Sequence, residues 1–152
     1  MPLNADAPID RAWIEAHIPH RGRMCLIDEV LEWNAERIRC ASGGHLAPDH
    51  PLRAHGRLGI ACGVEIAAQA MAVHGALLTG RDGTRPSSGL LASVRGVRMH
   101  VPSLDDVQSP LICDAVRMAG DAGTAIYQFE LLAADEPLLS GRAAVVLDAA
   151  AG

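Results

Sequence analysis

The chain has 152 residues, a formal net charge of −5 at pH 7 and 49% hydrophobic residues, a length that suits one domain with a substantial core. All 13 basic residues are arginines without runs, and the aromatic residues are only two Trp, one Tyr and one Phe. This composition excludes the basic stripe and the stacking side chains of a nucleic-acid-binding protein. An acidic protein partner is compatible with this charge balance only if arginines gather locally.

The first third of the chain predicts one short helix and two strands. Residues 1–9 contain two prolines and are expected to form a loose N-terminal arm. Asp10 can cap a short helix that Pro19 ends. Apolar runs separated by turn residues then predict strands at 30–33 and 37–42. Residues 43–59 form a long connection rich in Gly, His and Pro, and loops of this length are usually functional or disordered.

A long helix is predicted over residues 59–78. The segment is rich in the helix formers Ala and Met and contains no proline. Its apolar residues surround the whole helix, which indicates burial on most sides. The length would allow a membrane span, but Glu65, Gln69 and His74 interrupt the apolar surface, and such residues are rare in lipid. We therefore expect a central helix in a protein core and no membrane span.

The remainder of the chain predicts four strands separated by turns rich in Asp, Gly and Pro. In residues 126–131 the side chains alternate with a period of two, as in a strand with one buried face. A run of strands segregated from one long helix indicates an α+β fold with an antiparallel sheet. A sheet wrapped around a single helix is the hotdog arrangement, and we expect one such domain over residues 1–152. The predicted strands are 90–101, 110–120, 124–134 and 137–148.

Glu65 is the residue of the central helix that most needs an explanation. A carboxylate on a buried apolar helix must be hydrogen-bonded, paired or protonated. Gln69 lies four residues on and shares its face, whereas His74 lies on the opposite side. Glu65 is therefore either a structural carboxylate that ties down a loop end or an acid that holds its proton and lines a pocket.

The cysteines and histidines predict no metal site. The four cysteines are scattered without a CxxC pair, and most lie in apolar runs where a free thiol behaves as a small hydrophobe. His45, His50 and His55 recur every five residues, which is not a standard ligand spacing. Without a basic-then-apolar leader, we expect reduced thiols in a cytoplasmic protein.

Three pieces of the sequence resemble the 3-hydroxyacyl-(acyl carrier protein) dehydratases of the hotdog superfamily. Ile18 to Arg21, followed by residues 24–30, is similar to the family's LPHRxPFLLVDRV opening. Residues 65–69, EIAAQ, are similar to its helical EAxAQ, and the order of elements matches over almost the whole chain. Residues 49–52, DHPL, resemble the small dehydratases of aryl-polyene-type gene clusters.

The resemblance implies a hydro-lyase that removes water from a 3-hydroxyacyl thioester on acyl carrier protein and gives a trans-2-enoyl thioester. The pathway would be fatty-acid or aryl-polyene/polyketide-type synthesis, and no cofactor is expected. The implied partners are acyl carrier protein with its acyl-phosphopantetheine arm and a second subunit. That subunit makes either a homodimer or higher oligomer, or a heterodimer with a related dehydratase.

The site residues follow from the resemblance except for the base. The family places its catalytic histidine in a GHFP loop fourteen residues before the helical Glu, and this chain has no such loop. His50 lies fifteen residues before Glu65 and is our first choice for the base, with His55, ten residues before it, as second choice and His45 as an outside choice. Glu65 would act as the acid.

The remaining site residues have supporting roles. Backbone N–H groups near Gly59 and Ile60, at the expected start of the helix, are natural donors to the thioester oxygen. Gln69 would orient Glu65 or a loop carbonyl, and His20 and Arg21 would brace a loop. Two alternatives stay open: a catalytically weak acyl-binding subunit that pairs with an active homologue, and a hotdog acyl thioesterase.

Overall fold

The computed structural model describes residues 9–20, 22–79, 89–121 and 123–147. The expected N-terminal arm falls largely on residues 1–8, outside these ranges. Single 3₁₀ turns lie at Gly22–Met24, Gly44–Leu46 and Ile60–Cys62. The helices and strands are α1 (Arg11–His17), β1 (Glu29–Trp33), β2 (Arg37–Ser42), α2 (Gly63–Thr79), β3 (Gly89–Met99), β4 (Leu111–Gly120), β5 (Thr124–Ala133) and β6 (Glu136–Leu147).

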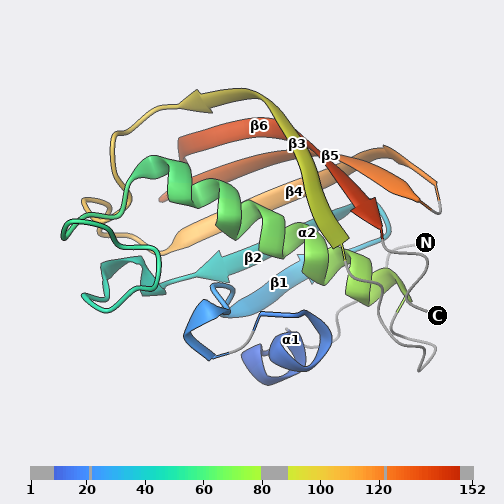
Figure 1. Cartoon of the computed structure of the whole chain (residues 1–152), viewed down its shortest axis with the longest axis horizontal. Coiled ribbons are helices and arrows are strands. Elements are labelled where there is room, and N and C mark those ends of the chain that lie inside the picture. The colour runs from blue at the N-terminus through green and yellow to red at the C-terminus, as the bar shows by residue number, and fades with distance from the viewer. Residues whose placement is uncertain (1–8, 21, 80–88, 122, 148–152) are drawn as a thin grey trace.

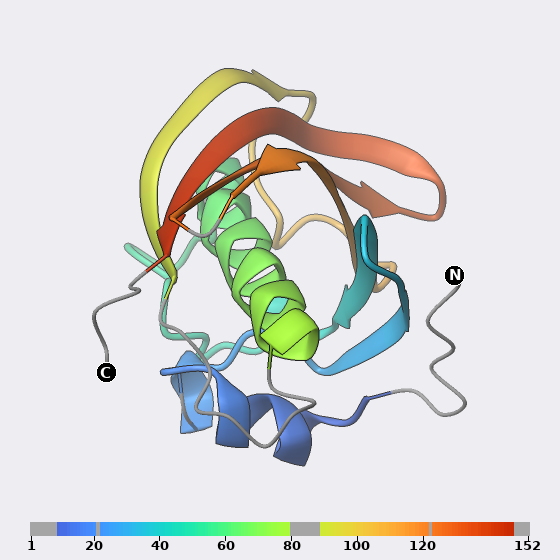
Figure 2. The ribbon, with the colours of Figure 1, turned by 90° about the vertical axis from the view of Figure 1, so that its right-hand side faces the viewer.

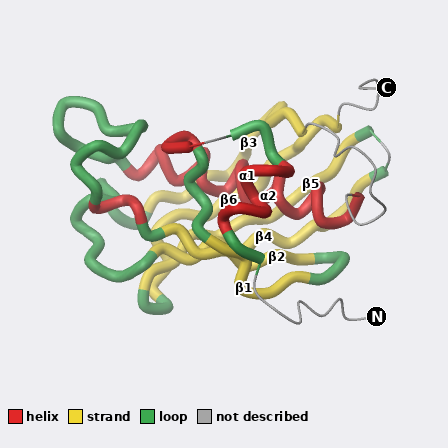
Figure 3. The backbone as a smooth tube through the Cα atoms, turned by 90° about the horizontal axis from the view of Figure 1, so that it is seen from below, coloured by secondary structure: helices red, strands yellow, loops and turns green. Residues whose placement is uncertain are grey.

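The six strands form one antiparallel sheet in the order β1-β2-β4-β5-β6-β3. The sheet curls around α2, which runs through its concave side (Figures 1 and 2). The short helix α1 lies against α2 on the side that the sheet leaves open, as the views from the end and from below show (Figures 2 and 3). The predicted hotdog fold is therefore confirmed.

The core lies between α2 and the concave face of the sheet. Along β5, Tyr127, Phe129 and Leu131 are buried, which confirms the predicted alternation. From α2 the core receives both small side chains, such as Ala67, and larger ones, such as Ile66. The segment Ile60–Leu78 is long and apolar enough to cross a membrane, with a hydropathy of 1.4, but most of it is buried against the sheet. The apolar composition of this segment is therefore explained by its burial against the curled sheet.

Gly63 marks the point where α2 comes closest to the sheet. A Cβ on this residue would lie 2.7 Å from Leu139 Cδ2 and 2.9 Å from Leu131 Cδ2, closer than carbon atoms pack. A methyl group at this position would therefore force the two leucine side chains to shift in the core. Gly75, later in the same helix, has no atom within 4 Å of its Cβ position.

The two edges of the sheet differ. Val30 of β1 exchanges two backbone hydrogen bonds with Ile9, N···O 3.2 and 2.8 Å, so the preceding chain covers this edge. At the other end of the sheet, β3 pairs with β6 on one side, and no described strand pairs with its other side. β3 is thus the open edge of the described sheet.

His74 is a fully buried imidazole on the sheet-facing side of α2. Its Nε2 donates to the backbone oxygen of Asn34 at 2.8 Å, so in the neutral ring Nδ1 accepts from the Tyr127 hydroxyl at 2.7 Å. Burial lowers the pKa of His74 below its ordinary value, although the bond to Asn34 opposes this. The histidine is a core residue that joins α2 to β5 and to the β1–β2 turn.

We predict opposite effects on stability for two glycine substitutions in α2. Gly63→Ala should lower the free energy of unfolding by about 1–3 kcal/mol, because the new methyl group overpacks the contact with Leu131 and Leu139. Gly75→Ala, the matched control, should raise it by about 0.5–1 kcal/mol through helix propensity. Urea unfolding measures both, and equal effects would refute this packing argument.

We also predict that His74 makes stability depend on pH. The unfolded chain protonates this imidazole below about pH 6.5, whereas the folded chain keeps it neutral to a lower pH. Protonation of His74 therefore does not affect the free energy of unfolding above about pH 6.5. Below this pH the free energy of unfolding falls as pH decreases, by at most about 1.4 kcal/mol per pH unit. Denaturant unfolding of the wild type and of His74→Gln at pH 7.5 and 5.5 is the test. An equal loss of unfolding free energy between these two pH values in both proteins would contradict the prediction.

Candidate functional site

Glu65 lies in the first turn of α2, on the stripe of the helix that the sheet does not cover. Ala68 and Ala72 continue this stripe, both of them half-buried. The stripe forms the floor of a hollow of about 350 Å³ whose wall is largely apolar. The other lining residues are Pro19, His20, Leu91 and Val145. The small side chains of α2 therefore leave an apolar space beside a carboxyl group, at the gap between α1 and the open edge strand β3.

Two side chains hold one oxygen of Glu65. His20 Nε2 lies 3.3 Å from Glu65 Oε1, and Gln69 Nε2 donates to the same oxygen at 3.3 Å. Oε2 takes part in neither contact. The Glu65 side chain is 38% exposed, and its imidazole neighbour comes from the opening motif instead of the 43–59 connection, where the sequence places the base. The reason is that Pro19 and His20 lie beside the first turn of α2.

Gln69 joins this site to the opening motif. Its side chain is fully buried, with Oε1 accepting from the Leu26 N–H at 2.7 Å and Nε2 donating to the Met24 oxygen at 2.8 Å. Gln69 thus contacts Glu65 and also a loop carbonyl, the two groups that the sequence offered as alternatives for it to orient. Because its polar atoms are all used inside the protein, it offers no group to a substrate in this arrangement.

His50 lies in a different hollow from Glu65. This second hollow, of about 180 Å³, is also lined by Cys25, Asp28 and Asp49 and shares no lining residue with the Glu65 hollow. His50 Nδ1 accepts from the Leu52 N–H at 3.1 Å, which leaves the proton of the neutral ring on Nε2. Burial, and then the charge of Arg53, lower the pKa of His50. His50 is thus suited to be a neutral base, but one chain does not bring it to Glu65.

The other two histidines of the connection face elsewhere. His55 is exposed at the tip of a two-residue turn closed by two hydrogen bonds between Ala54 and Arg57. His55 and Gly56 have positive φ angles of 54° and 75°, as this tight turn requires. His45 is buried, with Nε2 2.8 Å from the Val107 oxygen. Neither is within ion-pair distance of Glu65 in the described part of the chain.

The predicted oxyanion donors need a correction at Ile60. The Ile60 N–H already donates to the Pro102 oxygen at 3.1 Å, because residues 58–60 lie antiparallel to residues 102–104. The α-helix itself begins at Gly63, after a 3₁₀ turn, so its free N–H groups start later than the sequence indicates. Gly59 lies at the beginning of that turn.

His20 is the imidazole neighbour of Glu65. The sequence predicts a loop brace at this position, and the contact with Glu65 depends on tertiary structure. An imidazole and a carboxyl group at 3.3 Å can exchange a proton with each other or with a ligand. In an apolar hollow this arrangement suits proton transfer better than metal binding. Among the described residues, no cluster of His, Cys, Asp and Glu could hold a metal ion.

The cysteines lie outside this site. All four are free, and Cys40 and Cys113 are directly opposite each other in the β2–β4 pair. Burial raises the pKa of Cys113 to about 12 and also raises that of Cys40. The thiols of Cys40 and Cys113 therefore stay protonated and pack as small apolar groups in the sheet.

The fold and the Glu65 hollow define a hotdog protein with a carboxyl group on its central helix. The chain belongs to the ApeP-like family, described as ApeP dehydratases, whose model matches residues 12–150. A comparison with curated protein sequences gave no match.

Solved structures of similar fold include dehydratases and thioesterases. The chain matches the dehydratase heterocomplex ApeI:P from Xenorhabdus doucetiae with a TM-score of 0.78 and 21% identity, over 89% of this chain and 90% of that one. A thioesterase from Pseudomonas aeruginosa matches with a TM-score of 0.58 and 14% identity, over 83% and 84%. An HP0420 homologue from Helicobacter felis gives 0.63 and 12%, over 96% and 93%. At these identities the likeness shows the fold alone.

Proposed function

We propose that this protein removes water from a 3-hydroxyacyl thioester carried on acyl carrier protein, in aryl-polyene or fatty-acid-type synthesis in the cytoplasm. Membership of a dehydratase family supports the reaction class. The observation that carries the proposal is Glu65, held by Gln69 and His20 at the edge of an apolar hollow. The stripe of Ala68 and Ala72 gives room for an acyl chain beside the carboxyl group.

The reaction needs one base and one acid. The base takes the C2 proton, the C2–H electron pair forms the C2=C3 double bond, and the C3–O bond breaks with its electrons on oxygen. An acid protonates this oxygen, which leaves as water. Glu65 is the acid, because Oε2 is not used by His20 or Gln69 and can reach a hydroxyl group in the hollow.

The geometry of the chain limits which histidine can act as the base. His50 remains our proposal, since its lowered pKa keeps it neutral at cytoplasmic pH. Because it lies in a separate hollow, His50 can serve Glu65 only from a second subunit. His20 is the alternative base, already 3.3 Å from Glu65 in the same chain.

A second subunit fits the position of the site. Leu91 of the open edge strand β3 lines the same hollow as Glu65, so a chain that pairs with β3 would complete the wall of the hollow. Open strand edges are commonly covered in this way. The solved ApeI:P heterocomplex supports a related dehydratase as that subunit, and a second copy of this chain is the other choice.

A catalytically silent subunit is the second candidate function. It is favoured by one observation, that no histidine of the 43–59 connection contacts Glu65 within the described chain. Product analysis with a 3-hydroxyacyl thioester separates these functions: an enoyl thioester indicates the dehydratase, a free thiol indicates a thioesterase, and unchanged substrate indicates the silent subunit.

We predict that Glu65→Gln preserves the fold and lowers the rate of dehydration at least about 100-fold, because the amide cannot deliver the proton. Formation of the enoyl thioester measures the rate, and the melting temperature checks the fold. Glu32→Gln, an exposed position on β1, is the matched control and should keep full activity. Turnover near the wild-type level in Glu65→Gln would exclude this mechanism.

A complementation experiment identifies the base. His50→Ala and Glu65→Gln should each be inactive, and an equimolar mixture should recover up to about a quarter of wild-type activity, because half of the pairs then contain one intact site of two. His55→Ala should retain most activity, since that side chain lies on an exposed turn. Where sedimentation shows that the chain pairs with itself, no recovery in the mixture, together with an inactive His20→Ala, would replace His50 by His20 of the same chain.

A further inference from the structure

Arg53 is a largely buried arginine in the 43–59 connection, and no step of the proposed reaction uses it. Its side chain is only 17% exposed. Nε donates to the Ala47 oxygen at 2.8 Å, Nη1 to the Gly56 oxygen at 2.9 Å and Nη2 to the His45 oxygen at 3.4 Å. One guanidinium group therefore holds three backbone carbonyl groups that are spread along the connection.

The bonds of Arg53 enclose His50. The His50 N–H donates to the Ala47 oxygen at 3.2 Å, which is the same oxygen that Arg53 Nε binds. On the other side of the turn, the Arg53 N–H donates to the His50 oxygen at 3.0 Å, and the Leu52 N–H donates to the imidazole Nδ1 at 3.1 Å. The backbone and the ring of His50 are thus held by a turn that the Arg53 side chain closes.

A carboxylate outside the connection lies beside Arg53. Asp105 Oδ2, in the segment between β3 and β4, is 3.7 Å from Arg53 Nη1 and accepts from Arg57 Nε at 2.8 Å. Arg57 also donates to the Ser103 hydroxyl at 3.1 Å. The connection is therefore tied to the 103–105 segment, and Arg53 links this tie to the turn of His50.

The charge of Arg53 acts on the same imidazole. Burial is the main cause that lowers the pKa of His50, and the positive charge of Arg53 is the next; His45 adds to this, and Asp49 opposes it. The remaining charged groups that line the His50 hollow are within ion-pair distance of carboxylates, Arg11 of Asp28 at 3.2 Å and Arg23 of Asp49 at 3.9 Å. A base must be neutral to take a proton, so a fixed positive charge beside it favours the working form.

We infer that Arg53 is the positioning residue of His50: it fixes the loop that carries this imidazole and keeps a permanent positive charge beside the ring. Arg53 lines neither the Glu65 hollow nor the His50 hollow, so its effect on the reaction passes through His50. The inference rests on the proposed role of His50 as the base. Lysine would keep the charge but not the planar fork of donors, and glutamine would lose the charge, so the two substitutions separate the two effects.

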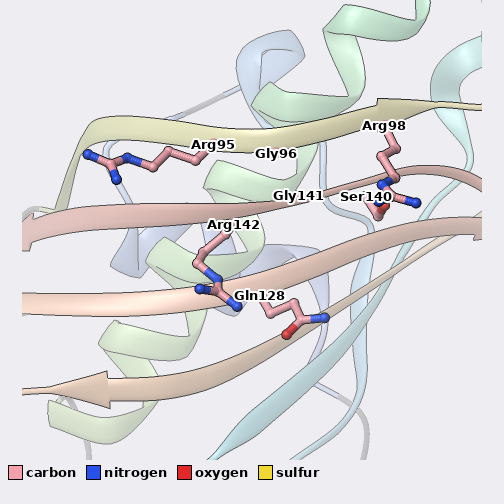
Figure 4. A pocket seen from close by; sticks show the side chains of 7 residues that line it. All are labelled: Arg95, Gly96, Arg98, Gln128, Ser140, Gly141 and Arg142. Atoms are coloured by element: carbon pink, nitrogen blue, oxygen red, sulfur yellow. The ribbon is translucent and has the colours of Figure 1, made fainter.

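The arginines on the outer face of the sheet provide a matched control. Arg95 and Arg98 of β3 and Arg142 of β6 line a shallow hollow of about 400 Å³, and their guanidinium groups do not converge on one point (Figure 4). In contrast to Arg53, the Arg142 side chain makes no hydrogen bond or ion pair with the described part of the chain. Arg142→Gln therefore removes one positive charge without breaking a tie.

The experiment follows His50 by NMR titration of its imidazole and by the pH dependence of kcat/KM. In Arg53→Gln the ring should titrate at a higher pH than in the wild type, and kcat/KM should fall at least about tenfold because the base is misplaced. Since the neutral ring is the base, this loss should be larger at about pH 5.5 than at about pH 7.5. Arg53→Lys should keep the wild-type titration and lose rate about equally at both pH values. Arg142→Gln should match the wild type in both measurements.

Amide hydrogen exchange tests the hold on the loop without any turnover. The His50 N–H should exchange at least about tenfold faster in Arg53→Gln and in Arg53→Lys, because the Ala47 oxygen is no longer fixed. If Arg53→Gln does not fold, Arg53→Lys decides the inference by this measurement, and exchange as slow as in the wild type would overturn it.

Three other results would also overturn the inference. These are an unchanged His50 titration in Arg53→Gln, the same shift in Arg142→Gln, and full activity of Arg53→Gln in an active protein. If product analysis finds no dehydration by the wild type, the proposed function fails, but the titration and the exchange still test the hold of Arg53 on His50.

Discussion

The buried side chain of Gln69 is the interaction on which the site depends. Its amide binds Met24 and Leu26 on one side and Glu65 on the other, so it ties the segment before β1 to the first turn of α2. The same tie brings His20 beside Glu65. A buried amide that lost either partner would leave an unsatisfied polar group in the core, which is costly. The opening motif and the helical motif are therefore one structural unit.

Much of the fold could be predicted from the sequence because its signals are local. The α2 segment is apolar throughout and has no proline, which predicts a buried helix. The side chains of β5 alternate with a period of two, which predicts a strand with one face packed on the core. The start of α2 was placed four residues early, at Gly59 instead of Gly63, because a 3₁₀ turn continues the apolar run without continuing the α-helix.

The site was only partly predictable, because its contacts join distant parts of the chain. Glu65 and Gln69 are related by helical spacing and could be paired from the sequence. The neighbour of Glu65 could not, since His20 and His50 are both histidines in motifs that resemble the family. The structure distinguishes them, because His20 lines the hollow of Glu65 whereas His50 lines another hollow. The β-bulge between Arg95 and Arg98 of β3 could not be predicted either, because it depends on the pairing of β3 with β6.

The two bonds between Ile9 and Val30 have a consequence for growth of the sheet. Strand addition needs a free row of N–H and C=O groups, and a sheet with two such rows can extend without limit into fibres. Here one row is partly used by the chain itself at Val30, so a strand added at β1 would have to displace these two bonds, whereas one added at β3 would not.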